Sequence, residues 1–332
     1  MKLMPYYSLF TTTLFMGTFM TLSSNHWVYM WMGFEINLMS FIPMILHSNT
    51  NQETEAAVKY FLIQALGSSL ILLSSLSMTF NPYSIFSQNV MLFTLIFALM
   101  IKMGAAPFHF WLPQIMSSIS WLMCMILATW QKIAPLFIII SISSSISNKF
   151  IMLIAMISTT VGGLGGLNQT HLRPLLAYSS IAHLGWMIGA SSISSCTSTV
   201  YFIIYAMMTL SIMSIMFINT LKSNYMSSIS NMPISISLSL MILFLSLGGL
   251  PPLLGFFPKW LMIKSMIFQN MFMFVSVMIM GSLISLFYYL SLFFNMYTNN
   301  MTKIHMNKLT SPLIMGITIM SSLTLGIAPL VI

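Results

Sequence analysis

Long apolar stretches follow one another along almost the whole 332-residue chain, and this pattern constrains the fold more than any other feature. A helix needs about 20 mostly apolar residues to cross roughly 30 Å of hydrocarbon. Short polar breaks separate eleven such stretches, with predicted bounds 5–23, 27–46, 57–79, 89–112, 119–143, 149–168, 175–193, 199–221, 236–264, 271–293 and 312–331. We therefore predict an all-α, polytopic transmembrane helical bundle that forms a single transmembrane domain over residues 1–332.

The composition excludes other classes of protein. Charged residues make up 4% and hydrophobic residues 58% of the chain, whereas about a quarter of an ordinary soluble domain is charged. The apolar majority excludes intrinsic disorder, and two cysteines, Cys124 and Cys196, are too few for a disulfide scaffold. The net charge of +8 is scattered singly, without a basic run or a recognisable binding module, so no nucleic-acid partner is expected.

Basic residues are distributed unevenly between the two ends of the predicted spans. One side holds only Lys149 and Lys264, and the side of the N-terminus holds Lys2, Arg173, Lys222, Lys303 and Lys308. Because loops rich in Lys and Arg stay on the cytoplasmic side, the N-terminus is predicted to lie in the cytoplasm or its organellar equivalent.

A few ionisable residues fall inside the predicted spans, where a charge costs roughly 2.5–3.5 kcal/mol by insertion scales. They are Glu35, Lys102, Lys132, His183 and Lys259, and Lys102 and Lys132 are predicted to lie far from either end of their spans. One interpretation is structural, with a lysine paired to Glu35 to fix helix packing. However, one carboxylate cannot neutralise three lysines. Burial disfavours the charged form of a lysine and a nearby carboxylate favours it, so such a set can also act as a proton relay.

Two of the predicted spans carry Gly and Pro beside these charges. They are interrupted within 102–111 and within 248–259. Interior Pro removes a backbone hydrogen bond, and a freed carbonyl at membrane depth must face protein or water. Paired broken helices in two halves are typical of inverted-repeat transporters. We therefore predict antiporter-like inverted repeats of five helices, 5–143 and 149–293, followed by an extra C-terminal helix, 312–331.

Several further residues have both a functional and a structural interpretation. His109 follows Pro107 in the first break, where a relay or hydration role competes with simple packing. His183 follows Ser179 and Ser180 and predicts a polar, water-bearing helix face.

Other features are interpreted structurally. The glycine run at 162–166 favours close helix packing, since it lacks the strand and the Lys of a phosphate loop. Aromatic residues at span ends are expected to be interfacial anchors, and these include Trp27, Trp111, Trp121 and Tyr201. Glu53 and Glu55 are expected to be solvated or paired with Lys59, and the loop histidines lack metal-ligand spacing.

An ordered set of motifs resembles one family over nearly the full chain. The motifs are WMGFEIN (31–37), EAAVKYF (55–61), KMGAAPFHFW (102–111), WQKIAP (130–135), GLNQT (166–170), SSIAHLGW (179–186), LGGLPP (247–252) and GFFPKW (255–260). The chain is similar to the chain 2 family of NADH-ubiquinone oxidoreductase in animals. These are the mitochondrially encoded, antiporter-like membrane subunits of respiratory complex I. A methionine content of 36 residues fits a mitochondrial code with an extra Met codon.

The resemblance implies a proton-translocating subunit of the membrane arm that couples remote quinone reduction to pumping. Glu35 resembles the family's key glutamate, Lys102 its paired lysine, Lys132 the central lysine and Lys259 the lysine of the second broken helix. No cofactor is expected in this chain, because the resemblance places flavin, iron–sulfur clusters and quinone in other subunits. The expected partners are other membrane-arm subunits, especially neighbouring antiporter-like ones, together with lipids and transported protons. The expected location is the mitochondrial inner membrane, with the N-terminus on the matrix side.

Two alternatives remain open at the level of the sequence. The chain could be a subunit of a stand-alone cation/proton antiporter, which would not co-migrate with NADH-oxidising activity. It could also be a structural spacer of the membrane arm whose charges serve only assembly. The excess of lysines over carboxylates inside the spans argues against the spacer.

Overall fold

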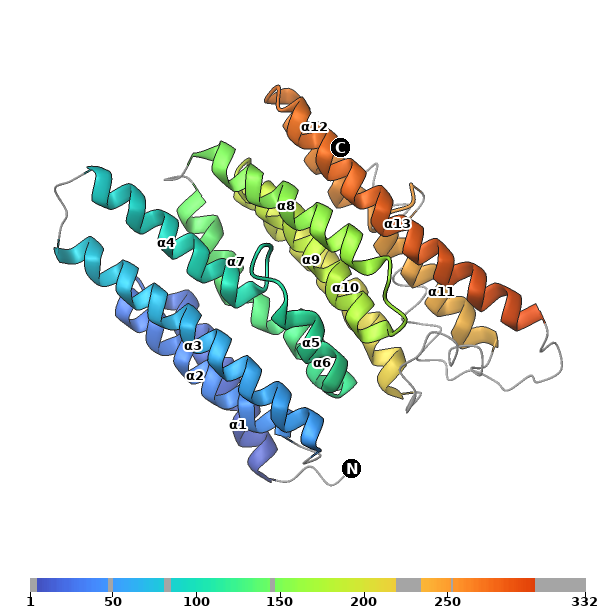
Figure 1. Ribbon diagram of the computed structural model, residues 1–332, viewed down its shortest axis with the longest axis horizontal. Coiled ribbons are helices and arrows are strands. Elements are labelled where there is room, and N and C mark those ends of the chain that lie inside the picture. Colours follow the sequence, from blue (N-terminus) through green and yellow to red (C-terminus); the bar gives the residue numbers. More distant parts are fainter. Residues whose placement is uncertain are drawn as a thin grey trace. The chain divides into compact units, whose positions relative to one another are not determined.

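The computed structural model describes residues 5–46, 50–80, 85–143, 147–218, 234–251 and 253–301, and every regular element in these ranges is an α-helix (Figure 1). Helices suit a bilayer because they satisfy each backbone N–H and C=O within the segment. Six helical stretches are long and apolar enough to cross a membrane, and two shorter ones, Val90–Met103 and Ser237–Gly248, are also apolar. The predicted all-helical membrane fold is confirmed. The span predicted at 312–331 lies outside the described residues, and the count of eleven stays a prediction.

The chain divides into two compact units between Ile146 and Ser147. The helices of unit 1 are α1 (Pro5–Ser23), α2 (Trp27–Ile45), α3 (Asn51–Phe80), α4 (Ile85–Met103), α5 (Trp111–Ser118), α6 (Trp121–Ala128) and α7 (Trp130–Ile142). Those described in unit 2 are α8 (Asn148–Gly166), α9 (Leu172–Ser191), α10 (Ser195–Ile218), α11 (Ile234–Gly248), α12 (Phe256–Phe268) and α13 (Phe272–Met301).

In unit 1, α2 lies against both α1 and α3, and α4 packs against α3 and α7. The contact between α1 and α2 is close because glycine occupies the crossing. A Cβ atom added to Gly17 would lie 2.9 Å from the backbone nitrogen of Asn37. Small residues at such crossings let backbones approach and gain van der Waals contact, which drives helix association in lipid.

In unit 2, α9 packs against α8, α10 and α13, and it is buried along nearly its whole length. Its crossing with α8 again depends on glycine, since a Cβ atom on Gly162 would lie 2.5 Å from the backbone nitrogen of Ala182. The glycine run of α8 therefore packs helices closely, as its composition predicts.

Equivalent features of the two units recur at a constant shift of 145 residues. The helix starts Trp27 and Leu172 of α2 and α9 are related in this way, as are Trp111 and Phe256 of α5 and α12. The glycine crossings follow the same shift, because Gly17 contacts Asn37 and Gly162 contacts Ala182. These two helix starts and one close crossing are therefore spaced alike in the two units.

Three predicted spans are interrupted in the structure. The stretch 89–112 contains the end of α4 and the start of α5, and the stretch 236–264 contains most of α11 and the start of α12, which confirms the two broken helices. The stretch 119–143 also divides, at Thr129, into α6 and α7, and this interruption was not predicted. As a result, Lys102 lies in the last turn of α4 and Lys132 in the first turn of α7. The prediction that Lys102 lies far from the end of its span was wrong, whereas Lys132 lies in the middle of the apolar stretch Trp121–Ile142, which is long enough to cross a membrane.

Candidate functional site

The break after α4 is built around a glycine in the left-handed region. Gly104 has a φ of +72°, and its N–H and that of Ala105 donate to the carbonyl oxygen of Met100, at 2.9 and 3.0 Å. A residue with positive φ just past the last helical residue is a common way to end a helix and satisfy its carbonyls. Side chains satisfy two further carbonyl oxygens at the end of α4. The Trp111 indole donates to Ile101 O at 3.1 Å, and the Gln64 amide donates to Lys102 O at 3.2 Å.

Lys102 is 7% exposed, and its ammonium lies over an aromatic ring. Its Nζ is 4.3 Å from the centroid of the Phe34 ring, a cation–π geometry. The stem passes Gly67, where an added Cβ atom would lie 3.0 Å from the lysine Cγ. Glu35, the next residue on α2, interacts electrostatically with Lys102, but in the described part of the chain the two form no direct ion pair. Lys102 therefore rests on Phe34 with the carboxylate nearby.

A small cavity with a mixed polar and apolar lining lies beside Lys102. Its volume of about 10 Å³ is close to the minimum that holds one water molecule. The Gln131 amide on α7 donates a 2.8 Å hydrogen bond to Asn37 Oδ1 on α2 at its wall. The lining residues come from α2, α3, α4 and α7, and they are Phe34, Asn37, Leu38, Tyr60, Gln64, Lys102, Gln131 and Pro135.

Lys132 is the residue after Gln131, which lines this cavity, and it is 1% exposed. It lies three residues after the interruption at Thr129 and three residues before Pro135. Because proline has no N–H, Pro135 cannot donate to the carbonyl of Gln131, the residue four positions earlier. The most deeply buried lysine in the chain's described part thus has a helix interruption before it and a missing backbone hydrogen bond after it.

Lys259 occupies the corresponding break of unit 2. Gly249 follows α11 with a φ of +83°, and its N–H donates to Leu245 O at 3.2 Å. Lys259, 6% exposed in the first turn of α12, donates from Nζ to the carbonyl oxygen of Gly248 at 2.9 Å. A lysine ammonium is favourable at a helix C-terminus, where the unpaired carbonyls carry partial negative charge.

The two candidate histidines have different surroundings. His109 is buried in the break of unit 1, and its Nδ1 lies 3.1 Å from the carbonyl oxygen of Pro107. His183 is 4% exposed on α9, and its Nδ1 lies 3.0 Å from the hydroxyl of Tyr201 on α10. Tyr201 is 1% exposed, so the prediction that it anchors the chain at the interface was wrong. Trp111 and Trp121 were also predicted to be interfacial anchors, but they are buried because they pack inside their unit.

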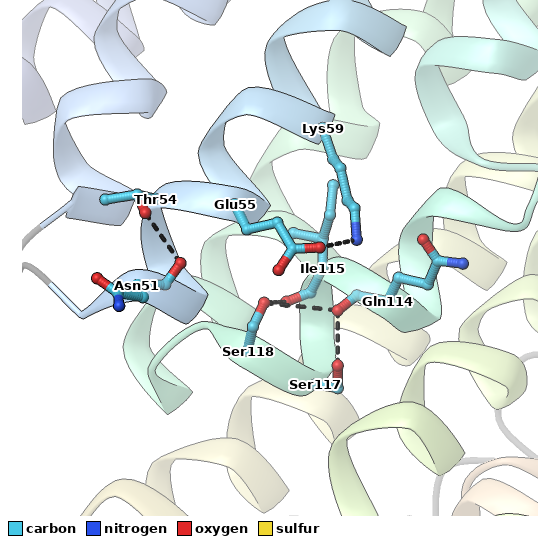
Figure 2. Close-up of polar contacts among 8 residues, drawn as sticks. All are labelled: Asn51, Thr54, Glu55, Lys59, Gln114, Ile115, Ser117 and Ser118. Carbon is cyan, nitrogen blue, oxygen red and sulfur yellow. Dashed lines mark hydrogen bonds and ion pairs between the residues drawn. The ribbon is translucent and has the colours of Figure 1, made fainter.

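The exposed charges near the start of α3 behave differently from the buried ones. Lys59 and Glu55 form an ion pair of 2.5 Å one helical turn apart, as expected, and Figure 2 shows it next to the α5 residues Gln114 and Ser118. Within α5, the Ser117 hydroxyl donates a 2.6 Å hydrogen bond to the backbone carbonyl oxygen of Gln114. Glu53 differs from the expectation of a solvated acid, because it is buried.

The structure thus brings together Glu35, Lys102 and the cavity wall next to Lys132 in unit 1, and it places Lys259 and His183 in unit 2. Within the described ranges, no three His, Cys, Asp or Glu residues are arranged to hold a metal ion. Sequence reasoning missed Phe34, Gln131 and Tyr201, because neutral residues inside apolar helices carry no charge signal.

Comparisons with known proteins agree with this architecture. Residues 24–285 match the family described as NADH:quinone oxidoreductase/Mrp antiporter, TM. NADH-ubiquinone oxidoreductase chain 2 of Lumbricus terrestris is 43% identical over 87% of this chain and 86% of its own length. The same-named protein of Locusta migratoria is 42% identical over 91% of this chain and 90% of its own length.

Solved structures with this fold include chains from respiratory complex I and from an Mrp complex. A chain of respiratory complex I from Thermus thermophilus with bound aureothin superposes with a TM-score of 0.83 at 22% identity, over 97% of this chain and 78% of its own length. A chain of the Mrp complex from Dietzia sp. DQ12-45-1b gives a TM-score of 0.75 at 14% identity, over 91% of this chain and 61% of its own length. At these identities the likeness concerns the fold alone.

Proposed function

The chain belongs to the NADH:quinone oxidoreductase/Mrp antiporter transmembrane family, and from this we propose that it translocates protons as a membrane-arm subunit of NADH:ubiquinone oxidoreductase. One observation carries the proposal. Lys102, Lys132 and Lys259 are each nearly inaccessible to solvent, and each lies at an interruption of its helix. A structural helix in lipid has no need of such residues, since every buried charge costs several kcal/mol.

The interruptions explain how buried lysines can handle protons. A helix break leaves backbone carbonyls that accept hydrogen bonds from an ammonium or a water molecule, as Gly248 O does for Lys259. Burial makes the ammonium costly, so a modest change in nearby charge can decide whether a lysine keeps its proton. A proton moved against the membrane potential requires about 2.3 kcal/mol per 100 mV. Quinone reduction in other subunits would supply this energy.

Glu35 and Lys102 form the proposed coupling element. The Lys102 ammonium rests on Phe34 while Glu35, the adjacent residue, acts on it only at a distance. Movement of this ammonium towards the carboxylate would change the electrostatic potential at Lys132. The Asn37–Gln131 hydrogen bond links α2 to the residue next to Lys132 and supports this route. His109 and His183 are proposed as further relay or hydration sites.

The finer parts of the assignment rest on the curated relatives and the sequence. We place the chain in the mitochondrial inner membrane with its N-terminus on the matrix side, beside other membrane-arm subunits and lipids. Flavin, iron–sulfur clusters and quinone are assigned to other subunits, so the redox chemistry occurs outside this chain. Residues 5–143 and 149–293 are proposed to be repeats of five spans each, and the shift of 145 residues between Gly17 and Gly162 supports this.

Substitution of Lys132 by Met tests the function, because Met keeps the length and apolar stem of lysine without its proton. We expect the complex to assemble and redox-linked pumping to be lost. Lys149→Met, an exposed lysine at the start of α8, is the matched control and should pump normally. Normal pumping by the Lys132→Met complex would refute the relay.

A stand-alone antiporter remains the competing function, because the Mrp chain shares the fold. Native gel electrophoresis with NADH dehydrogenase staining separates the two. Co-migration of the chain with NADH-oxidising activity is the expected result. Migration of the chain apart from that activity would favour the antiporter.

A further inference from the structure

A histidine and a tyrosine form a hydrogen-bonded pair inside unit 2. The Nδ1 atom of His183 lies 3.0 Å from the hydroxyl oxygen of Tyr201, and both side chains are almost completely buried. The pair joins α9 to α10. A second tyrosine of α10, Tyr205, packs its ring 5.2 Å from the imidazole centroid. The Tyr201 hydroxyl and aromatic packing thus both hold the imidazole.

A hydroxyl partner has a specific chemical consequence for an imidazole. A tyrosine O–H can donate to an unprotonated Nδ1, and its oxygen can accept from a protonated one. The pair therefore stays hydrogen-bonded whether the ring is neutral or charged. A carboxylate partner could only accept and would stabilise the charged ring. Tyr201 orients the ring without fixing its protonation state.

The shift of 145 residues relates the surroundings of this pair to the lysine site of unit 1. It places Tyr205 at the position of Tyr60, which lines the cavity beside Lys102. It also places Ser180 at the position of Glu35. Ser180 and His183 are three residues apart on α9, a spacing that puts them on one face of the helix. Where unit 1 carries a carboxylate, unit 2 therefore carries a hydroxyl and an imidazole.

We propose that Tyr201 is the positioning residue of His183 in proton transfer through unit 2, a role that rests on the proposed function. A neutral imidazole donates Nδ1–H to the Tyr201 oxygen and accepts a proton at Nε2. The resulting imidazolium releases that proton from Nε2. Tyr201 remains a neutral phenol throughout, so the pair gains and loses one proton in each cycle.

The test compares proton-to-electron ratios of assembled complexes in sealed vesicles. Tyr201→Phe removes only the hydroxyl, and His183→Gln retains a hydrogen-bonding partner for it that does not titrate. We expect each single variant to lower the ratio to the same value and the double variant to lower it no further, because both changes disable one element. Tyr288→Phe removes another buried tyrosine hydroxyl of unit 2, on α13, and should keep the wild-type ratio.

Additive losses, or a wild-type ratio for either Tyr201→Phe or His183→Gln, would overturn the proposal. If the Tyr201→Phe complex does not assemble, Tyr201→Gln and Tyr201→Met are compared instead. Their side chains are similar in length, but only Gln carries a hydrogen-bonding group. The Gln variant should then pump more protons per electron than the Met variant, and equal ratios would contradict the positioning role. Lys132→Met reports on the proposed function independently, since it leaves this pair intact.

Discussion

The ammonium of Lys259 donates a 2.9 Å hydrogen bond to the carbonyl oxygen of Gly248, the last residue of α11. The lysine belongs to α12, so this bond joins the two halves of the broken helix across the interruption. It satisfies a helix-terminal carbonyl and gives a buried cation a partner without a carboxylate. A transferable proton is thereby held next to backbone oxygen.

Gly249→Ala should disturb this arrangement. Gly249 has a φ of +83°, and an added Cβ atom would lie 2.9 Å from the Lys259 Nζ. We expect a loss of about 1–2 kcal/mol of stability from the left-handed backbone and a lower proton-to-electron ratio from displacement of the ammonium. Gly104→Ala is the control, because it has a φ of +72° and its closest neighbours belong to Leu112 and Trp111. If both variants lower the ratio equally, displacement of Lys259 is not the cause.

Phe34→Leu should change the behaviour of Lys102. Removing the ring deletes a cation–π contact worth about 0.5–2 kcal/mol and leaves the electrostatic attraction of Glu35. We expect a direct Lys102–Glu35 ion pair in the variant structure and slower redox-linked pumping. Phe34→Tyr keeps the ring and should pump at close to the wild-type rate. An ammonium that stays in place in the Leu variant would contradict the role given to Phe34.

Much of the site could be predicted from the charged residues that lie within apolar stretches of the sequence. Lys102, Lys132 and Lys259 are conspicuous because the surrounding residues are apolar, and glycine and proline mark two of the three helix interruptions. The interruption at Thr129 has no such local signal, since Pro135 lies six residues later. The Tyr201–His183 bond was missed because tyrosine in an apolar helix is equally consistent with an interfacial anchor. Pairing across helices is a property of packing, and one helix's sequence does not reveal it.

Gln131→Leu should cost stability, because it removes the donor to Asn37 Oδ1. Asn37 is 4% exposed, and leaving its amide oxygen without this partner should cost about 1–3 kcal/mol. The double variant Asn37→Leu/Gln131→Leu removes both polar groups and should recover part of that loss. Thermal denaturation of the solubilised complex measures the difference. A double variant no more stable than Gln131→Leu alone would contradict this interpretation of the hydrogen bond.

Gly162→Ala should weaken the packing of α8 on α9. The new methyl group would lie 2.5 Å from the Ala182 backbone nitrogen, and backbone cannot yield as a side chain can. Overpacking of this kind typically costs about 1–3 kcal/mol, so the melting temperature should fall. Gly189→Ala is the matched control on α9, because its nearest atom is the flexible Met262 Cε at 3.0 Å. Equal melting temperatures for the two variants would show that the crossing tolerates separation.

The central claim is that the buried lysines at helix interruptions carry the translocated protons. Measuring the proton-to-electron ratio of the assembled complex in sealed vesicles tests it most directly, with Lys102→Met, Lys132→Met and Lys259→Met compared against the exposed-lysine controls Lys149→Met and Lys264→Met. We predict a reduced ratio for each of the first three and a wild-type ratio for both controls. Wild-type ratios in all five complexes would contradict the claim.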